Sequence, residues 1–400
     1  MPGGAPTRLL VIAALLAAVG APACGGGGGD GSSRGGHGAD RDGRAARFVA
    51  PDARRAGDCS RRDPCASLAR ALDVAKPGEV VEIAAGTYPE QQLTGAARPP
   101  SGRPVVFRPA SGARVEIGGL VVGAQDVELE RLEVTGLYVD ARARDVVLRE
   151  LTVKGALFIT SAARISVLGG SVGPGTDVSS QIKAESGSTT PPRDIRIEGV
   201  AFHDFTRSDP SAHVECLHVM AVERLTLRGN SFSNCEAFDV LFTKFGETGS
   251  PRDILIENNT FSCCRSGFYS VFLGGGHGEI WEDVLVRNNS ADRGFSVSQE
   301  AVGPRARVRF LSNVVPGVNP LLCGLPGVEW DYNVWSEGRP CGPNDRVAAS
   351  GFRNAAAGDF RLRRGAAAIG SGHPRSVPRV DADGRRRPQG GRPDAGAFEY

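Results

Sequence analysis

The stretches Asp253-Ile-Leu-Ile-Glu-Asn-Asn-Thr-Phe261 and Asp283-Val-Leu-Val-Arg-Asn-Asn-Ser290 are two copies of one short repeat. Each copy alternates apolar and polar residues for about four positions and then breaks at Gly or Asn, which is typical of a half-buried strand followed by a turn. Copies start at residues 126, 145, 164, 194, 224, 253, 283 and 307. Because so short a strand buries its apolar face only against neighbours, the pattern predicts coils stacked into a solenoid.

Four asparagines fall six residues after the start of their copies: Asn230, Asn259, Asn289 and Asn313. Successive coils of a parallel β-helix lie about 4.8 Å apart, so equivalent side chains stack along the axis. Asn also tolerates a left-handed bend, so we predict an Asn ladder at a bend. The repeat resembles the right-handed parallel β-helix of the pectin-lyase-like superfamily. That resemblance, with the general rule for parallel crossovers, predicts an all-β, single-stranded, right-handed parallel β-helix.

The two ends of the repeat region predict different structures. Ser67 is placed to cap a helix over residues 68–75, which we expect to be a short N-terminal capping helix. The phrase Gly86-Thr-Tyr88 resembles the same segment of secreted β-helix proteins, and residues 381–400 resemble their C-terminal segment. We therefore predict an N-terminal cap with the first coils over 47–104, coils over 105–335 and a C-terminal cap over 336–400. Residues 173–192 read as a loop.

The N-terminus predicts export. Arg8 precedes an apolar run of about eleven residues, too short to span a bilayer but suited to a signal peptide over residues 1–23. Cleavage after Ala23 would leave Cys24 first, and we expect it to be lipidated, with free secretion as the alternative. Residues 24–46 are Gly-rich and read as a flexible tether. The expected location is secreted or cell-surface, with a lipid anchor at the outer face of the cytoplasmic membrane.

Nine cysteines leave an even number once Cys24 is set aside, as expected in an oxidising compartment. Short spacings predict a Cys59–Cys65 and a Cys323–Cys341 disulfide. Cys235 and Cys264 each lie five residues after a ladder Asn, which favours a disulfide between them and leaves Cys216 with Cys263. The formal charge of +2 gives no general attraction to nucleic acid, so we expect no nucleic-acid partner and a monomer.

Chemistry-bearing residues gather where the coils lengthen to about 30 residues. Three of the six histidines, His203, His213 and His218, lie close together there with carboxylates beside them. The candidate catalytic residues are His213, Glu215, His218, Asp239, Lys244, Arg265 and Tyr269. A zinc site from the three histidines is an alternative without a compact motif. No cofactor is certain, and calcium at Asp381 and Asp383 is possible.

Two chemistries fit these residues. Glu215 and Asp239 are 24 residues apart, about one coil, and two outward carboxylates would form a glycosidase pair. Alternatively, Lys244 or Arg265 neutralises a uronate carboxylate while a histidine or Tyr269 removes the neighbouring proton, as in a lyase or epimerase.

A structural alternative without catalysis is that His213 and Glu215 form a surface ion pair. The sequence leaves two orientations for the His218 side chain, inward or outward. We expect an extracellular protein active on a uronate-bearing polysaccharide; the alternative is a non-catalytic surface module that binds glycan or an envelope partner.

Overall fold

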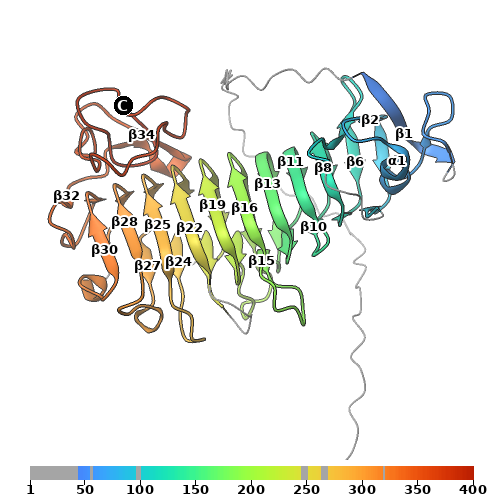
Figure 1. Ribbon diagram of the computed structural model, residues 1–400. Helices are drawn as coiled ribbons and strands as arrows, with labels where there is room; N and C mark the ends of the chain where they lie inside the picture. Colours follow the sequence, from blue (N-terminus) through green and yellow to red (C-terminus); the bar gives the residue numbers. More distant parts are fainter. Residues whose placement is uncertain (1–43, 55–56, 96–100, 245–250, 263–268, 319) are drawn as a thin grey trace, which may run out of the picture. The chain divides into compact units, whose positions relative to one another are not determined.

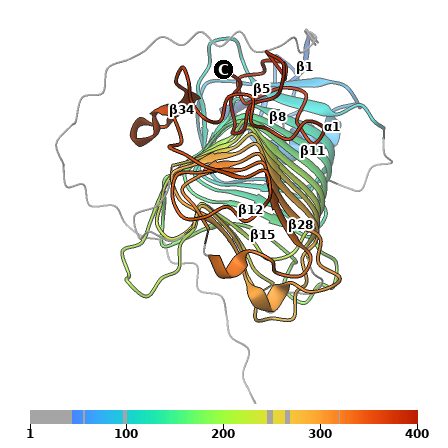
Figure 2. The same cartoon turned by 90° about the vertical axis from the view of Figure 1, so that its left-hand side faces the viewer.

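The protein winds into parallel coils whose strands stack in register (Figure 1). The computed structural model describes residues 44–54, 57–95, 101–244, 251–262, 269–318 and 320–400, all within one compact unit, Asp40–Tyr400. Each coil runs along three faces, which are seen end-on in Figure 2. The predicted parallel β-helix is therefore confirmed; its handedness stays a prediction.

Face 1 carries the strands that precede the bend of each repeat. They are β2 (Val80–Ile83), β5 (Val105–Pro109), β8 (Gln125–Glu130), β16 (Arg193–Glu198), β19 (Glu223–Arg228), β22 (Arg252–Glu257), β25 (Glu282–Arg287), β28 (Val308–Leu311) and β30 (Val328–Asp331). Two long strands, β11 (Arg144–Val153) and β13 (Ala163–Val172), continue through the bend. At the N-terminal end β1 (Ala45–Arg54) pairs with β2.

Face 2 follows the bend within the same sheet. Its strands are β3 (Gly86–Tyr88), β6 (Val115–Ile117), β9 (Glu133–Val134), β14 (Gly175–Thr176), β17 (Ala201–Thr206), β20 (Ser231–Cys235), β23 (Thr260–Ser262), β26 (Ser290–Ala291), β29 (Val314–Val315), β31 (Val334–Trp335) and β32 (Arg346–Val347). Inward rings stack along this face: Phe202 on Phe232 at 5.0 Å and Phe232 on Phe261 at 5.1 Å between centroids. Each fully buried Phe contributes about 1.5–3 kcal/mol relative to exposure.

Face 3 is a separate parallel sheet. Its strands are β4 (Gln91–Leu93), β7 (Leu120–Val122), β10 (Leu137–Val139), β12 (Leu157–Thr160), β15 (Ser180–Lys183), β18 (Leu217–Val219), β21 (Val240–Phe242), β24 (Val271–Leu273) and β27 (Phe295–Val297). The expectation of a loop over 173–192 was wrong in part, because β15 lies inside that range and pairs with β12 and β18. The polar residues there flank a short strand whose one buried apolar residue, Ile182, is a weak sequence signal.

The predicted Asn ladder is confirmed. The side-chain oxygen of Asn259 accepts the backbone N–H of Asn230 at 2.8 Å and its side-chain amide at 3.0 Å, and Asn289 and Asn313 repeat the arrangement. Asn333 and Asp345 extend the ladder beyond the residues named from the sequence.

The left-handed bend lies one residue earlier than the ladder position. Asn258 has a φ of 56° and Asn288 one of 50°, whereas the ladder residues themselves do not have positive φ. The ladder amides are therefore selected for their hydrogen bonds, because each satisfies buried backbone groups in the coil before it.

Both ends of the described solenoid carry non-repeating structure. Helix α1 (Leu68–Val74) begins after Ser67, whose hydroxyl accepts the N–H of Arg70 at 3.1 Å, and it packs against β1 and β4. Its role as a cap stays a prediction. Short 3-10 turns η1 (Gln299–Ala301) and η2 (Pro320–Leu322) follow later coils.

The C-terminal segment lies against the outside of the late coils. After β32 come β33 (Phe352–Asn354), η3 (Ala355–Ala357) and β34 (Asp359–Leu362), with β33 and β34 antiparallel. The rest of the segment contacts the bend between faces 1 and 2: Asn258 donates to the carbonyl of Val380 at 2.7 Å, and Ser290 Oγ accepts the N–H of Ala397 at 2.9 Å. Figure 1 shows this segment, in red, alongside the coils.

Candidate functional site on face 3

The outward positions of face 3 form one continuous row. In each three-residue strand the first and third residues are buried, so the middle residue points outward. Register connects the row along the axis through Tyr138, Phe158, Gln181, His218, Leu241 and Phe272. One histidine therefore stands in a row that is otherwise aromatic, aliphatic or neutral.

Glu215 is the buried centre of the site. It lies two residues before β18, and only 1% of the residue is exposed. Ser179 in the preceding coil holds it twice: Ser179 Oγ donates to Glu215 Oε2 at 2.9 Å and accepts the Glu215 N–H at 2.9 Å. The glycosidase hypothesis needed an exposed Glu215, but Glu215, Cys216 and Leu217 are consecutive buried residues and the alternation breaks there.

His213 pairs with Glu215 from the solvent side. Its Nδ1 contacts Glu215 Oε1, and 58% of its side chain is exposed. The hydrogen bond that His213 donates to this carboxylate raises the pKa of His213 above its ordinary value. A protonated imidazole is thus favoured at position 213.

His218 faces the other carboxylate oxygen. Its Nδ1 lies 3.9 Å from Glu215 Oε2, its Nε2 is hydrogen-bonded to Thr243 Oγ1 at 2.8 Å, and 13% of its side chain is exposed. Burial lowers the pKa of His218, because it disfavours the charged imidazole more than the nearby carboxylate favours it. Leu217 and Val219 are buried, which settles the facing of His218 as outward.

Asp239 does not join this group. Register pairs Leu217 with Val240, so Asp239 falls level with Cys216, one position away from the predicted match with Glu215. Its side chain is fully buried, and this burial raises its pKa well above the ordinary value, against a smaller opposing effect of the Ser270 hydroxyl. The predicted outward carboxylate pair was therefore wrong.

The inner disulfide differs from the prediction. Cys216 bonds Cys235, with Cα atoms 5.4 Å apart, whereas Cys235 was expected to bond Cys264 and Cys216 to bond Cys263. β20 extends to Cys235, which is buried and lies in register with Phe205 of the preceding coil. Cys263 and Cys264 themselves lie outside the described residues.

The two outer disulfides are confirmed: Cys59 bonds Cys65 and Cys323 bonds Cys341. Three disulfides among the described residues are typical of a protein of an oxidising, extracellular compartment.

Aromatic side chains border the site on its C-terminal side. Phe238 lies 5.6 Å from the His213 ring, and Phe272 stacks on Phe238 at 5.5 Å between centroids. Tyr269 continues the cluster 5.9 Å from Phe272. Tyr269 is thus near the site as an aromatic neighbour, while no contact among the described residues joins it to Glu215.

The two remaining candidate residues contribute less. The backbone N–H of Lys244 donates to the buried Glu279 at 3.3 Å, and Lys244 directly follows Thr243, the partner of His218. Arg265 lies outside the described residues.

Two contributors were missed by sequence reasoning, Ser179 and Thr243. Both are small hydroxyl residues in polar stretches, and only the register of face 3 shows that they meet Glu215 and His218.

The described residues give no support to a metal centre. They contain no group of three or more His, Cys, Asp or Glu side chains able to hold an ion. Asp381 accepts N–H groups from Asp383, Arg385 and Glu399, and Asp383 pairs with Arg361 at 2.8 Å, so donors already occupy the proposed calcium ligands. The three-histidine zinc set was wrong, because His203 lies on face 2.

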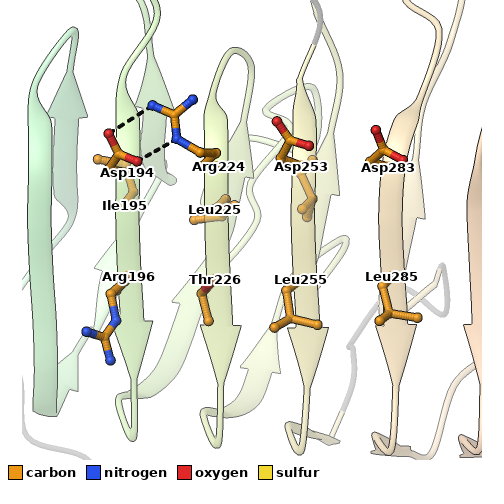
Figure 3. Close-up of a pocket in the computed structure, with 11 residues that line it drawn as sticks. Asp194, Ile195, Arg196, Arg224, Leu225, Thr226, Asp253, Leu255, Asp283 and Leu285 are labelled. Atoms are coloured by element: carbon orange, nitrogen blue, oxygen red, sulfur yellow. Dashed lines mark hydrogen bonds and ion pairs between the residues drawn. The ribbon is translucent and has the colours of Figure 1, made fainter. Parts of the chain in front are cut away.

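A shallow groove of about 470 Å³ crosses face 1 (Figure 3). Asp194, Arg224, Asp253 and Asp283 form its rim, with Arg224 ion-paired to Asp194 at 2.6 Å, and Leu255 and Leu285 lie in its floor. None of the candidate residues predicted from the sequence lines it.

Comparison with known proteins finds similarity only among solved structures, since no family model and no curated protein matches. A pectate lyase, Pel9A, is 14% identical with a TM-score of 0.46, covering 90% of this chain and 97% of that chain. PfbA, a surface adhesin of Streptococcus pneumoniae, is 13% identical with a TM-score of 0.43, covering 64% and 72%. XylC in complex with xylose is 9% identical with a TM-score of 0.46, covering 76% and 86%.

No helix in the described part of the chain is long and apolar enough to cross a membrane. The stacked coils, the parallel register and the Asn ladder make this chain a parallel β-helix, the fold implied by its sequence resemblance to the pectin-lyase-like superfamily.

Proposed function

We propose that the protein is an extracellular enzyme that acts by proton transfer on a uronate-bearing polysaccharide bound along face 3. The observation that carries this proposal is the single buried carboxylate of Glu215 between two histidines whose pKa values move in opposite directions. Groups whose environments push their pKa values apart are suited to act as an acid and a base in one site.

His218 has the properties of the base. Its lowered pKa favours the neutral imidazole near neutral pH, and its Nε2 already accepts a hydrogen bond if the Thr243 hydroxyl donates to it. In the proposed reaction Nε2 removes the proton on the carbon beside the uronate carboxylate. In a lyase the glycosidic C–O bond then breaks and the departing oxygen takes up a proton; in an epimerase the carbon is reprotonated from its other side.

His213 has the properties of the cation. Its raised pKa favours the imidazolium, and its exposed ring can approach the substrate carboxylate and stabilise the negative charge that develops on it. Glu215 orients both rings, and Ser179 orients Glu215. A glycosidase mechanism is disfavoured because Asp239 is fully buried and lies level with Cys216 and not with Glu215, so the two carboxylates do not form a pair.

The outward side chains of face 3 could bind an extended polysaccharide along their length. Tyr138 and Phe158 lie on one side of His218 along the axis, with ring centroids 6.1 Å apart, and Phe272 lies on the other side. Flat apolar rings with a few polar groups between them are the usual lining of ligand sites, and they match the apolar faces of sugar rings. The substrate is therefore expected to run parallel to the solenoid axis.

The test is a panel of uronate polymers incubated with the purified chain, followed by absorbance of an unsaturated product for a lyase and by NMR of the sugar protons for an epimerase. His218→Gln should lower kcat about 10²- to 10⁴-fold, the usual range for loss of a general base. His373→Gln, in the C-terminal segment, is the matched control and should keep activity. An active His218→Gln variant would refute the mechanism.

A second candidate is a non-catalytic glycan-binding module, favoured by the continuous aromatic row itself. Binding of a polymer by the chain without product, weakened by Phe158→Ala and not by His218→Gln, would support this alternative instead. If the chain neither binds nor converts any polymer, both the enzyme hypothesis and the binding-module hypothesis are refuted.

The N-terminal expectations also become a proposal: a signal peptide over 1–23, a lipid on Cys24 and a tether over 24–46. These residues lie almost wholly outside the described part of the chain. Mass spectrometry of the mature N-terminus tests it directly: a diacylglyceryl cysteine at position 24 is expected, and an unmodified cysteine there would indicate free secretion. If Cys24 carries the lipid, the protein is attached to the membrane through this lipid alone.

A further inference from the structure

A second polar group lies on the outside of face 2, and the site proposed above does not use it. His203 in β17 points outward because its neighbour Phe202 is fully buried. Its Nδ1 is hydrogen-bonded to Asp204 Oδ2 at 2.8 Å. The other oxygen, Asp204 Oδ1, accepts the side-chain amide of Asn234. The carboxylate is thus fixed at both oxygens, and it orients the imidazole so that Nε2 points away from it.

The residue beside His203 in the next coil is a serine. Register pairs His203 with Ser233 in β20, and both stand on the outer side, because Phe232 next to Ser233 is buried. Neighbouring strands lie about 4.8 Å apart, so these two side chains are adjacent. The preceding coil has Gly173 at this level, where an added Cβ would meet the His203 carbonyl oxygen at 1.9 Å. Ser233 is therefore the side chain that flanks the imidazole along the axis.

Ser233 lines a cleft. Its volume is about 660 Å³, and it lies between face 2 and the C-terminal structure around η3 and β34. One wall is made of Ser231, Ser233, Asn234, Thr260 and Ser262; the other is the turn Ala356–Gly358 with Phe360. The lining holds no charged side chain, so it suits a neutral ligand that is rich in hydroxyl groups or carries an ester.

We propose that this cleft is a second, hydrolytic site, in which Ser233 is the nucleophile, His203 its base and Asp204 the group that orients the base, and that its substrate is a neutral acyl ester such as an O-acylated sugar. A serine, a histidine and a carboxylate in this relation form the constellation that recurs for acyl transfer on unrelated folds. Here it is built from consecutive coils of one face, so adjacent rungs provide the nucleophile and the base.

The reaction balances without any further reagent. Ser233 Oγ attacks the acyl carbon while His203 Nε2 takes the hydroxyl proton, and the C–O bond to the sugar breaks as Nε2 returns that proton to the departing alcohol. Water, deprotonated by Nε2, then attacks the acyl-serine and releases the free acid and Ser233. Ser262, one coil further along the same row, is placed to donate to the carbonyl oxygen.

The experiment uses the full chain with p-nitrophenyl acetate as substrate and a fluorophosphonate as covalent probe. We expect the phosphonyl adduct on the peptide that contains Ser233, and Ser233→Ala should abolish both adduct and turnover. His203→Gln should lower the turnover rate about 10²- to 10⁴-fold at an unchanged melting temperature. Asp204→Asn should lower kcat with little change in KM, because it disturbs the orientation of His203 and not substrate binding.

Ser171→Ala is the matched control. Ser171 lies on the outer side of the same face one coil earlier, but register places it beside Ala201 and not beside His203, and it does not line the cleft. It should keep both labelling and turnover. Absence of an adduct on Ser233, turnover that survives Ser233→Ala, or an equal loss in Ser171→Ala would each overturn the proposal. None of these outcomes depends on His218, so the two sites are tested separately.

Discussion

His213 and His218 address different oxygens of one carboxylate: His213 pairs with Oε1 of Glu215, and His218 Nδ1 lies 3.9 Å from Oε2. Their difference in exposure decides the direction in which the pKa of each histidine shifts. The hydrogen bond to Glu215 raises the pKa of the exposed His213. Burial lowers the pKa of His218 by more than the same carboxylate raises it. One carboxylate thereby separates the two imidazoles into a protonated and a neutral form over a window of pH.

The first prediction is a bell-shaped pH dependence of kcat/KM for the proposed reaction. The acidic limb should report the lowered pKa of His218 and the basic limb the raised pKa of His213, because the active form needs the first neutral and the second protonated. Glu215→Gln should move the basic limb toward lower pH, since the interaction that raises the His213 pKa is removed. Titration of the imidazole protons by NMR checks the assignment; two histidines titrating together near their ordinary pKa would contradict it.

The second prediction concerns Asp239. Its folded-state pKa is raised, so the folded state holds a proton that the unfolded state releases. Stability is therefore fully present below the unfolded pKa of about 4 and is lost as pH rises toward the folded pKa, by at most about 1.4 kcal/mol per pH unit. Asp239→Asn should remove this loss and raise Tm near neutral pH.

A control for this effect is Asp253→Asn on face 1, whose side chain is exposed. It should leave the pH dependence of Tm unchanged. If Asp239→Asn instead lowers Tm more at pH 7 than at pH 4, then Asp239 is charged and paired in the folded protein, and the prediction is contradicted.

The repeat could be predicted from the sequence because each copy combines two features at fixed offsets. These are a strand with alternating apolar residues and, after it, an asparagine of the Asn ladder. Ile254 and Ile256 are buried on either side of the half-buried Leu255, and Asn259 follows at the same distance as in other copies. Faces 1 and 2 carry both signals. Face 3 carries only strands of three or four residues, such as Leu217–Val219, which are too short to be distinguished from any apolar pair.

Three of the seven candidate residues meet in the structure, in a geometry that differs from the one expected from the sequence. His213, Glu215 and His218 do meet, but Glu215 is buried, because the alternation of buried and exposed residues breaks before β18. A one-residue shift of register turns a side chain to another face, and the register that pairs Leu217 with Val240 separates Asp239 from these residues. Ser179 is separated from Glu215 by 36 residues, and no local pattern predicts such a contact.

The third prediction is that Asn289→Ala strongly destabilises the solenoid. Asn289 Oδ1 accepts two hydrogen bonds from Asn259, and its amide donates to the carbonyl of Ile256 at 2.9 Å, all in the buried interior. Each buried group left unpaired costs about 1–3 kcal/mol, so a total of roughly 3–6 kcal/mol is expected. Urea denaturation followed by circular dichroism measures it. Asn344→Ala, an exposed asparagine hydrogen-bonded to Asp331, should cost far less, and equal losses would contradict the assigned role of the ladder.

The fourth prediction is that a buried ion pair within the C-terminal segment keeps the segment in the fold that packs against the coils. Arg387 and Glu399 are both almost fully buried and lie 2.7 Å apart, and Arg387 also donates to the carbonyl oxygens of Asp394 and Gly396. Burial opposes both charges, lowering the pKa of Arg387 and raising that of Glu399, so each depends on the other. Arg387→Met should cost about 3–5 kcal/mol, because it leaves a carboxylate buried without its cation.

The same pair gives a local readout that separates loosening of the segment from unfolding of the coils. Hydrogen exchange should rise over residues 373–400 in Arg387→Met while the strands of face 3 stay protected, because the segment contacts the coils only from outside, through residues such as Asn258 and Ser290. Arg386→Met, the exposed neighbour, is the matched control and should exchange like the parent.

Replacing both partners, Arg387→Met with Glu399→Leu, should recover part of the loss of stability, since no unpaired charge then remains. Exchange that rises equally in all coils would mean that the segment and the solenoid unfold as one unit.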